Sequence, residues 1–271
     1  MSAARIARAA ALGILCSVLA VCLFADRFTS YSYATQFREL PNAAPSSLHL
    51  LGTDGLGRDL FTRLLYGTRV SLLLAPAAAI IATFLAAVLG CIAGFSGGWL
   101  EKAILAAADV SMALPLLLLL LALRAVLPLS ISPFVSIVAT FVLLGFLGWP
   151  ASLRVIWATA RALRNSDFIV LARATGCSRF RLLSRHVFPN LRPVLLAQFW
   201  ISIPLFVLTE ATLSMLGLGV MEPMASWGNL LKGLEDFSAV RANPWSLSPL
   251  LLLVVVVISF QLVLPQREEL A

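Results

Sequence analysis

The stretch VSLLLAPAAAIIATFLAAVLGCIAGF, residues 70–95, carries no charged side chain. A helix needs about 20 mainly apolar residues to cross the hydrocarbon core of a bilayer, so this stretch is long enough to span it. Five more stretches qualify in the same way: 9–25, 103–123, 131–151, 194–216 and 247–264. We therefore expect an all-α membrane protein with six transmembrane helices.

The overall composition supports lipid as the main solvent of this chain. Apolar residues make up 60% of the sequence and charged residues only 12%, whereas soluble proteins carry about 25% charged residues. The net charge of +7 comes almost wholly from arginine beside apolar stretches, with no aromatic side chains interleaved as in a nucleic-acid surface. We expect no nucleic-acid binding, and no disulfide framework from the four cysteines.

The arginine distribution predicts the orientation in the membrane. The loop at 152–193 holds eight arginines against a single acid, Asp167, and basic loops stay in the cytoplasm. Both termini are then cytoplasmic, with the first span kept as an uncleaved anchor. We expect an anchor helix plus extracytoplasmic segment at 1–69, a transmembrane core at 70–265 that includes the loop, and a short cytoplasmic tail at 266–271.

Local signals inside that loop predict an elbow of two helices. Residues 165–167 can cap a helix over 168–175, and Gly176 can adopt the left-handed conformation that ends it. Ser178 can cap a second helix, which we expect Pro189 to end. This second helix would carry an apolar face at helical spacing, formed by Phe180, Leu183 and Val187.

Two runs of the loop, DFIVLARATG at 167–176 and RHVFPN at 185–190, resemble the EAA loop of binding-protein-dependent ABC transporter permeases. Val170 stands where that family has its glutamate, and Leu171 replaces the first alanine of the triplet. The resemblance implies that the elbow contacts an ATPase subunit, with Phe180 and Leu183 as anchors. The candidate coupling residues are Asp167, Ala172, Arg173, Gly176, Phe180, Leu183, His186 and Pro189.

Two further motifs are similar to the C-type permeases of dipeptide, oligopeptide and nickel importers. The first is HLLGTDGLGRD at 49–59, leading to YGTRVS at 66–71, and the second is LSMLGLG at 213–219, followed by PMASWGN at 223–229. The resemblance implies the type I ABC importer permease fold in a bacterial inner membrane. Beyond Leu231 it fades, because the polar C-terminal motifs of the family are not found at 266–271.

The same resemblance implies what the protein does. It would be a non-catalytic permease subunit that forms, with a second permease, the path for di- or oligopeptides; nickel or another small solute is the alternative. Two ATPase subunits or a fused pair would bind ATP and Mg²⁺, and an extracytoplasmic solute-binding protein would deliver the cargo. The chain has no GxxxxGK[ST] sequence to cradle nucleotide phosphates, so we expect no cofactor or metal in it.

Polar residues outside the elbow allow two interpretations each. Turn-forming residues before the second span would fold into a structural lid or touch the delivering protein, and Arg58 can pair with a neighbouring aspartate. These residues are Gly52, Thr53, Asp54, Gly57, Arg58 and Asp59. Asp109 and Glu210 lie inside spans, where acids either line a pathway or cap and pair within the bundle.

Two other classes of protein fit the sequence less well. An ion-coupled secondary transporter would need a network of ionisable residues or inverted repeats, and only Asp109 and Glu210 are available. An intramembrane enzyme would need a nucleophile–base or metal constellation. The two histidines, His49 and His186, fall on opposite sides of the membrane in the predicted topology.

Overall fold

The computed structural model describes residues 3–126 and 132–263, and within these residues it contains helices, turns and one isolated bridge between Thr53 and Asp59. Five helical runs are long and apolar enough to cross a membrane: Arg5–Leu23, Leu60–Ser96, Pro133–Arg164, Leu183–Met215 and Pro244–Val263. A bent helix pair counts as a sixth span if its two halves are taken together. The prediction of a helical membrane protein is confirmed.

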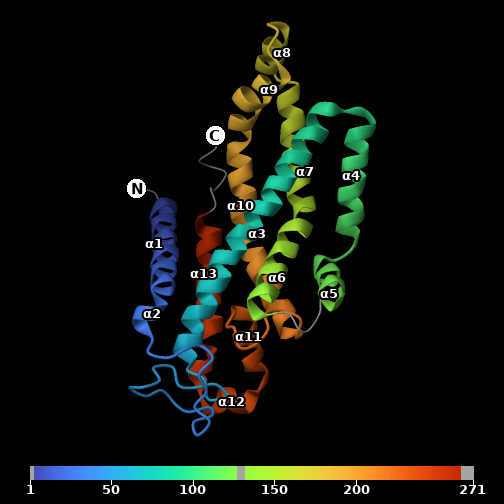
Figure 1. The fold of residues 1–271 in the computed structure, drawn as a ribbon. Helices are drawn as coiled ribbons and strands as arrows, with labels where there is room; N and C mark the ends of the chain where they lie inside the picture. Colours follow the sequence, from blue (N-terminus) through green and yellow to red (C-terminus); the bar gives the residue numbers. More distant parts are fainter. Residues whose placement is uncertain (1–2, 127–131, 264–271) are drawn as a thin grey trace.

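The helices follow one another with short connections after a long first loop (Figure 1). They are α1 (Ala3–Leu23), α2 (Ala25–Phe28), α3 (Leu60–Ser96), α4 (Gly98–Ala113), α5 (Leu116–Val126), α6 (Pro133–Leu147), α7 (Trp149–Arg164), α8 (Asp167–Ala174), α9 (Arg179–Leu182), a π-helical turn (Leu183–Val187), α10 (Phe188–Met215), α11 (Trp227–Lys232), α12 (Phe237–Ala242) and α13 (Ser248–Val263). Short 3₁₀ turns cover Gly233–Glu235 and Pro244–Leu247.

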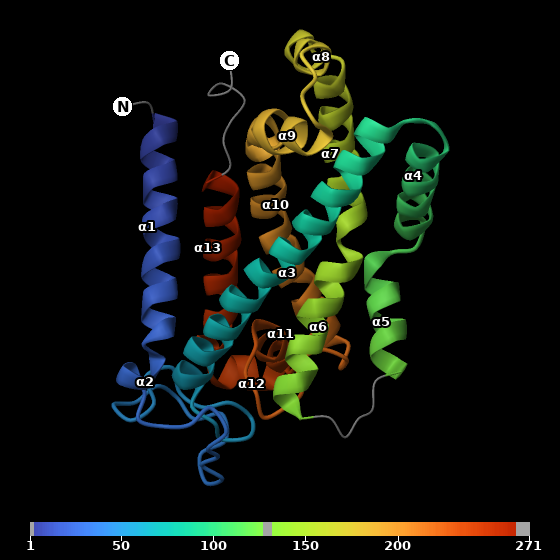
Figure 2. The same cartoon turned by 45° about the horizontal axis from the view of Figure 1, so that its top comes forward.

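Helix α3 runs diagonally through the bundle and packs against α6, α7 and α10 (Figure 2). Small residues let α3 and α7 approach closely. A Cβ atom added to Gly94 would lie 2.8 Å from the Cβ of Ala160, and one added to Gly90 would lie 3.0 Å from Ile156. This contact joins the centre of the bundle to the elbow that follows α7.

The second span begins much earlier than residue 70. Helix α3 starts at Leu60, where Asp59 accepts a hydrogen bond of 2.7 Å from the backbone amide of Thr62. A search for apolar runs misses this first part of the helix, because residues 60–69 are polar in sequence. In the structure Arg63 and Thr68 are nevertheless buried and bonded to distant partners.

The third span is broken, not straight over 103–123 as predicted. Helices α4 and α5 meet at an angle of 80°. Leu114 is extended, with φ −95° and ψ 124°, because the ring of Pro115 disfavours helical geometry in the preceding residue.

Two predicted boundaries of the 152–193 loop are wrong. Helix α7 continues the fourth span to Arg164, because Leu153, Ile156 and Ala160 are fully buried. Pro189 lies in the first turn of α10 and so begins a helix instead of ending one, which suits a residue without a backbone N–H. The exposed part of the loop therefore shrinks to the elbow around α8 and α9.

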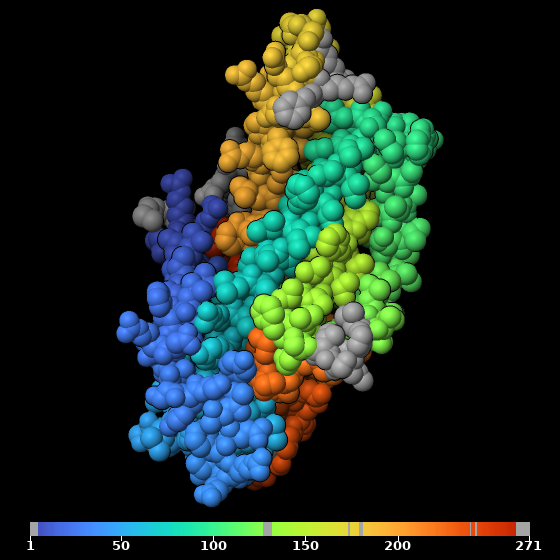
Figure 3. Space-filling model, viewed as in Figure 1, coloured from blue at the N-terminus to red at the C-terminus, as the bar shows by residue number. Residues whose placement is uncertain are grey.

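The two ends of the bundle differ. The knob formed by α8 projects beyond the other helices, and the start of α1 and the end of α13 point toward the same side (Figure 1). The loop at 29–59, in blue, covers the opposite end near α12 (Figure 3). We call these the α8 end and the α12 end; the predicted tail at 266–271 lies outside the described residues.

Candidate functional site

The turn between the two elbow helices is formed as the sequence predicts, by Gly176 and Ser178. Gly176 has φ +79°, and a Cβ atom there would meet nothing within 4 Å, so backbone conformation alone favours glycine. The amide of Cys177 donates to the carbonyl of Ala172 at 3.1 Å and closes the end of α8. The hydroxyl of Ser178 accepts from the amide of Arg181 at 3.4 Å, at the start of α9.

One side of the elbow is packed onto the bundle. Ile169, Leu182, Val187 and Leu191 form a buried cluster with Ala160 of α7. The predicted docking face of Phe180, Leu183 and Val187 is therefore wrong in one member, since Val187 faces inward and is 1% exposed. The side chains of Phe180 and Arg173 lie outside the described part.

The other side of the elbow leaves large apolar side chains exposed. On α8, Phe168 is 42% exposed, Val170 55% and Leu171 65%. These residues lie between the ends of two candidate spans, at Arg164 and Leu183, and so outside the membrane-crossing helices. We call Phe168, Val170 and Leu171 the α8 patch; sequence reasoning missed it, although Val170 and Leu171 were the residues that departed from the family motif.

The other predicted coupling residues differ in their exposure. Ala172 packs against the buried cluster, whereas Asp167 is exposed in the first turn of α8. The carbonyl of His186 accepts a hydrogen bond of 2.6 Å from the side chain of Asn190. Pro189 and Leu183 are exposed.

At the α12 end, charged side chains form a connected cluster. The Nε of Arg58 lies 2.7 Å from Asp54, which confirms the predicted pairing with a neighbouring aspartate. Arg58 also reaches Glu222 at 2.5 Å, and the buried Arg63 reaches the same carboxylate at 3.1 Å. Sequence reasoning missed Arg63 and Glu222, since no local pattern joins residues so far apart.

The turn-forming motif is one folded unit around this cluster. Gly52 and Gly57 have φ of +75° and +71°, and a Cβ on Gly57 would lie 2.1 Å from the carbonyl oxygen of Phe37. Thr53 donates to the carbonyl of Leu40, and Asp59 pairs with His49 at 2.9 Å. The geometry favours the structural-lid interpretation of this motif.

The two acids inside spans have separate partners. Glu210 is fully buried and accepts hydrogen bonds from Ser214 at 2.8 Å and Ser226 at 2.9 Å. Ser226 also caps α11, so Glu210 ties α10 to α11. Asp109 is half-exposed and pairs with Arg154 of α7. Both acids therefore pair within the bundle.

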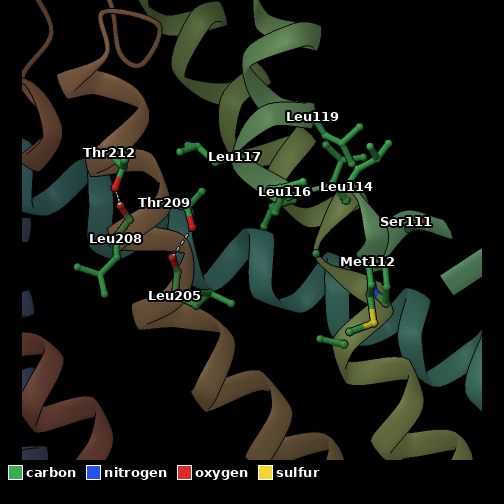
Figure 4. Close-up of a pocket in the computed structure, with 15 residues that line it drawn as sticks. Ser111, Met112, Leu114, Leu116, Leu117, Leu119, Leu205, Leu208, Thr209 and Thr212 are labelled. Carbon is green, nitrogen blue, oxygen red and sulfur yellow. Dashed lines mark hydrogen bonds between the residues drawn. The ribbon is translucent and has the colours of Figure 1, made fainter. Parts of the chain in front are cut away.

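A cavity of about 430 Å³ lies between the α4–α5 bend, the α6–α7 junction and α10. Its lining is mostly apolar, and it includes Leu117 and Leu208 (Figure 4). The hydroxyls of Thr209 and Thr212 donate to backbone carbonyls of α10 at 2.8 Å each, so they are already satisfied. Sequence reasoning missed this groove, for which Pro115 was the available signal.

Known proteins are similar to this chain in sequence. Residues 86–265 match the family model described as the binding-protein-dependent transport system inner membrane component. The chain is 33% identical over 234 residues to the oligopeptide transport system permease protein OppC of Bacillus subtilis (strain 168). These residues cover 86% of this chain and 74% of the relative.

Two further relatives are also named as permease proteins of transport systems. The dipeptide transport system permease protein DppC of Alkalihalophilus pseudofirmus is 32% identical over 251 residues, covering 92% of this chain and 80% of the relative. The glutathione transport system permease protein GsiD of Pectobacterium atrosepticum is 32% identical over 246 residues, covering 90% and 79%. The chain therefore belongs to the family of binding-protein-dependent inner membrane components, the permease subunits of ABC importers.

Proposed function

We propose that this chain and a second permease form the membrane path of an ATP-driven importer for di- or oligopeptides. The named functions of the relatives support peptides over nickel, since these relatives belong to oligopeptide, dipeptide and glutathione systems. An extracytoplasmic binding protein delivers the peptide. Two partner ATPase subunits, or a fused pair, bind ATP and Mg²⁺, while this chain carries no catalytic role.

The α8 patch is the observation that carries the coupling part of this proposal. Three large apolar side chains stand exposed on a knob outside the candidate spans, where neither lipid nor the chain's own core covers them. Burial of one such side chain stabilises a contact by about 1.5–3 kcal/mol. The arginine excess supports a cytoplasmic position of the knob, where an ATPase subunit can cover the patch.

Two helices link the knob to the bundle. Ile169 of α8 packs against Ala160 of α7 in the buried cluster, and α7 in turn packs along α3. The run from the elbow into α10 is helical from Leu183 to Met215. It carries Leu205 and Thr209 into the apolar groove. A movement of the knob is therefore passed to the groove by packed helices, as a rigid-body switch requires.

The test is reconstitution of the chain with the permease, ATPase and binding proteins that co-purify with it. Uptake of labelled peptide should require both ATP and the binding protein. Leu171→Asp should lower ATPase retention by about tenfold, because it places a charge in an apolar contact worth at least about 1.4 kcal/mol. Ser184→Asp, also exposed on the elbow, is the control; equal loss from both variants would refute the α8 patch as the docking surface.

A further inference from the structure

Arg124, in the last turn of α5, is a buried arginine, only 7% exposed. It forms no ion pair with an acid in the part of the chain that the structure describes. Its guanidinium donates instead to neutral acceptors. These are the carbonyls of Leu218 and Gly219, at 3.0 Å each, and the hydroxyl of Ser136 on α6. A buried cation without an acid is costly, so these acceptors must hold it in place.

The bonds of Arg124 join the two walls of the groove beside α10. The lining of the groove includes Leu116, Leu117 and Leu119 from α5 and Leu208 and Thr212 from α10 (Figure 4). Arg124 lies on α5 beyond these leucines, and the carbonyls that it binds follow directly after α10. Arg124 therefore fixes the separation of the two walls beyond one end of the groove.

One peptide group connects Arg124 with the buried acid Glu210. The carbonyl of Gly219 accepts from Arg124, and the amide of Val220, in the same peptide group, donates to the hydroxyl of Ser214 at 3.2 Å. That hydroxyl donates in turn to the carboxylate of Glu210 at 2.8 Å. The relay therefore runs without a break from the cation to the acid. Hydrogen bonds in such a chain polarise and strengthen one another.

The glycines of the LSMLGLG motif at 213–219 shape this relay. Gly217 has φ +79° and turns the chain after α10. A Cβ atom added to Gly219 would lie 1.8 Å from the hydroxyl oxygen of Ser214, so any larger residue would push the peptide group away from that hydroxyl. The motif therefore has a physical role, since it brings two carbonyls to Arg124 and one amide to Ser214.

Helix α5 is positioned by its neighbours and not by a straight continuation of α4. The two helices meet at 80°, across the extended Leu114, and α5 packs against α6 and α10. A break of this kind lets a helix move as a unit about the residues that join it to the preceding one. The bend thus supplies a hinge at one end of α5, and Arg124 holds the other end.

We propose that Arg124, Glu210 and the peptide group between Gly219 and Val220 form a latch. The latch holds α5 against the end of α10 and closes the groove at that end. Arg124 is then a positioning residue for transport, because a peptide that passes this end of the groove requires α5 to move away from α10. The effect on uptake rests on the proposed function, whereas the closure itself does not.

The test measures the distance between α5 and the end of α10 in the reconstituted complex, by pulsed EPR without nucleotide or peptide. Spin labels on Leu118→Cys and Leu216→Cys report it, since both positions are exposed, and all native cysteines are replaced by alanine. Arg124→Gln should raise the ratio of separated to closed forms about tenfold, which corresponds to about 1.4 kcal/mol, because it removes charge-assisted hydrogen bonds. Arg161→Gln, an exposed arginine outside the groove, is the matched control. If the relay acts as a unit, adding Glu210→Gln should raise the ratio no further.

Each other outcome would overturn part of the latch. An unchanged distance in Arg124→Gln would show that packing alone holds α5, and an equal change in Arg161→Gln would indicate general loosening. Additive effects of Arg124→Gln and Glu210→Gln would show that the relay does not join them. Arg124→Lys, which keeps the charge, should give a smaller change and serves if the glutamine variant does not fold.

The role in transport has its own readout, the peptide taken up per ATP hydrolysed. This ratio should fall in Arg124→Gln, while ATPase retention stays normal because the α8 patch is unchanged. A normal ratio despite a separated α5 would show that the latch positions the helix but does not gate the groove. Because the distance is measured without peptide, failure of the peptide assay leaves the test of closure intact.

Discussion

The guanidinium of Arg63 donates to the carboxylate of Glu222 at 3.1 Å, across a sequence separation of 159 residues. Arg58 reaches the same carboxylate at 2.5 Å, so one acid accepts from two arginines. Only 1% of the Arg63 side chain is exposed, whereas 48% of Glu222 is. The pair joins the first turn of α3 to the segment between α10 and α11, and so holds the α12 end together.

Removal of Glu222 should destabilise the protein. Glu222→Ala leaves Arg63 buried with Asp54 as its nearest acid, at 3.6 Å. We expect a loss of about 2 kcal/mol, less than for a fully buried pair because Glu222 is half-exposed. Thermal unfolding of the purified chain in detergent measures this. Glu235→Ala, on the same side of the bundle and without a described ion pair, should leave the midpoint unchanged.

Residues 70–95 predict a membrane helix because lipid requires long apolar runs. The same criterion misses helical segments that are polar in sequence. The first turns of α3 are polar in sequence, yet Thr68 is buried because it accepts a hydrogen bond of 2.8 Å from Trp227. Such long-range partners decide helix bounds, and no local pattern reveals them.

Some features of the candidate site were predictable from the sequence and others were not. The turn at Gly176 follows from glycine chemistry and is confirmed. The inward direction of Val187 was not predictable, because it depends on packing against α7. The groove beside α10 likewise depends on the 80° bend at Pro115, and a proline alone does not set the size of a bend.

Gly176 should tolerate only residues that accept a positive φ. Its φ is +79°, and an added Cβ atom would meet no neighbour within 4 Å, so any cost is conformational. Asn adopts this region readily, whereas an ordinary residue pays about 1–2 kcal/mol and proline cannot adopt it. ATP-dependent uptake should fall in the order Gly176→Asn, Gly176→Ala, Gly176→Pro. Equal activity of the Asn and Pro variants would contradict this role.

Removal of the Glu210 carboxylate should lower the stability of the protein. It accepts hydrogen bonds from Ser214 and Ser226, and its second carboxylate oxygen has no described partner. Glu210→Ala removes both bonds inside the bundle, so we expect a loss of about 2 kcal/mol, with a smaller loss for Glu210→Gln. Unfolding midpoints of the two variants measure this. A Glu210→Ala variant of normal stability that fails to transport would instead support the pathway interpretation.

The groove beside α10 should be sensitive to the volume of Leu208. This side chain is 44% exposed and lines the groove, so Leu208→Trp should narrow it without disturbing the buried core. We expect peptide uptake to fall at least about tenfold, the equivalent of about 1.4 kcal/mol in the transport step. ATPase retention should stay normal, because the α8 patch is unchanged. Leu196→Trp is the matched control, since Leu196 is 56% exposed on the same helix and does not line the groove. Equal uptake by the two tryptophan variants would show that the groove does not limit peptide uptake.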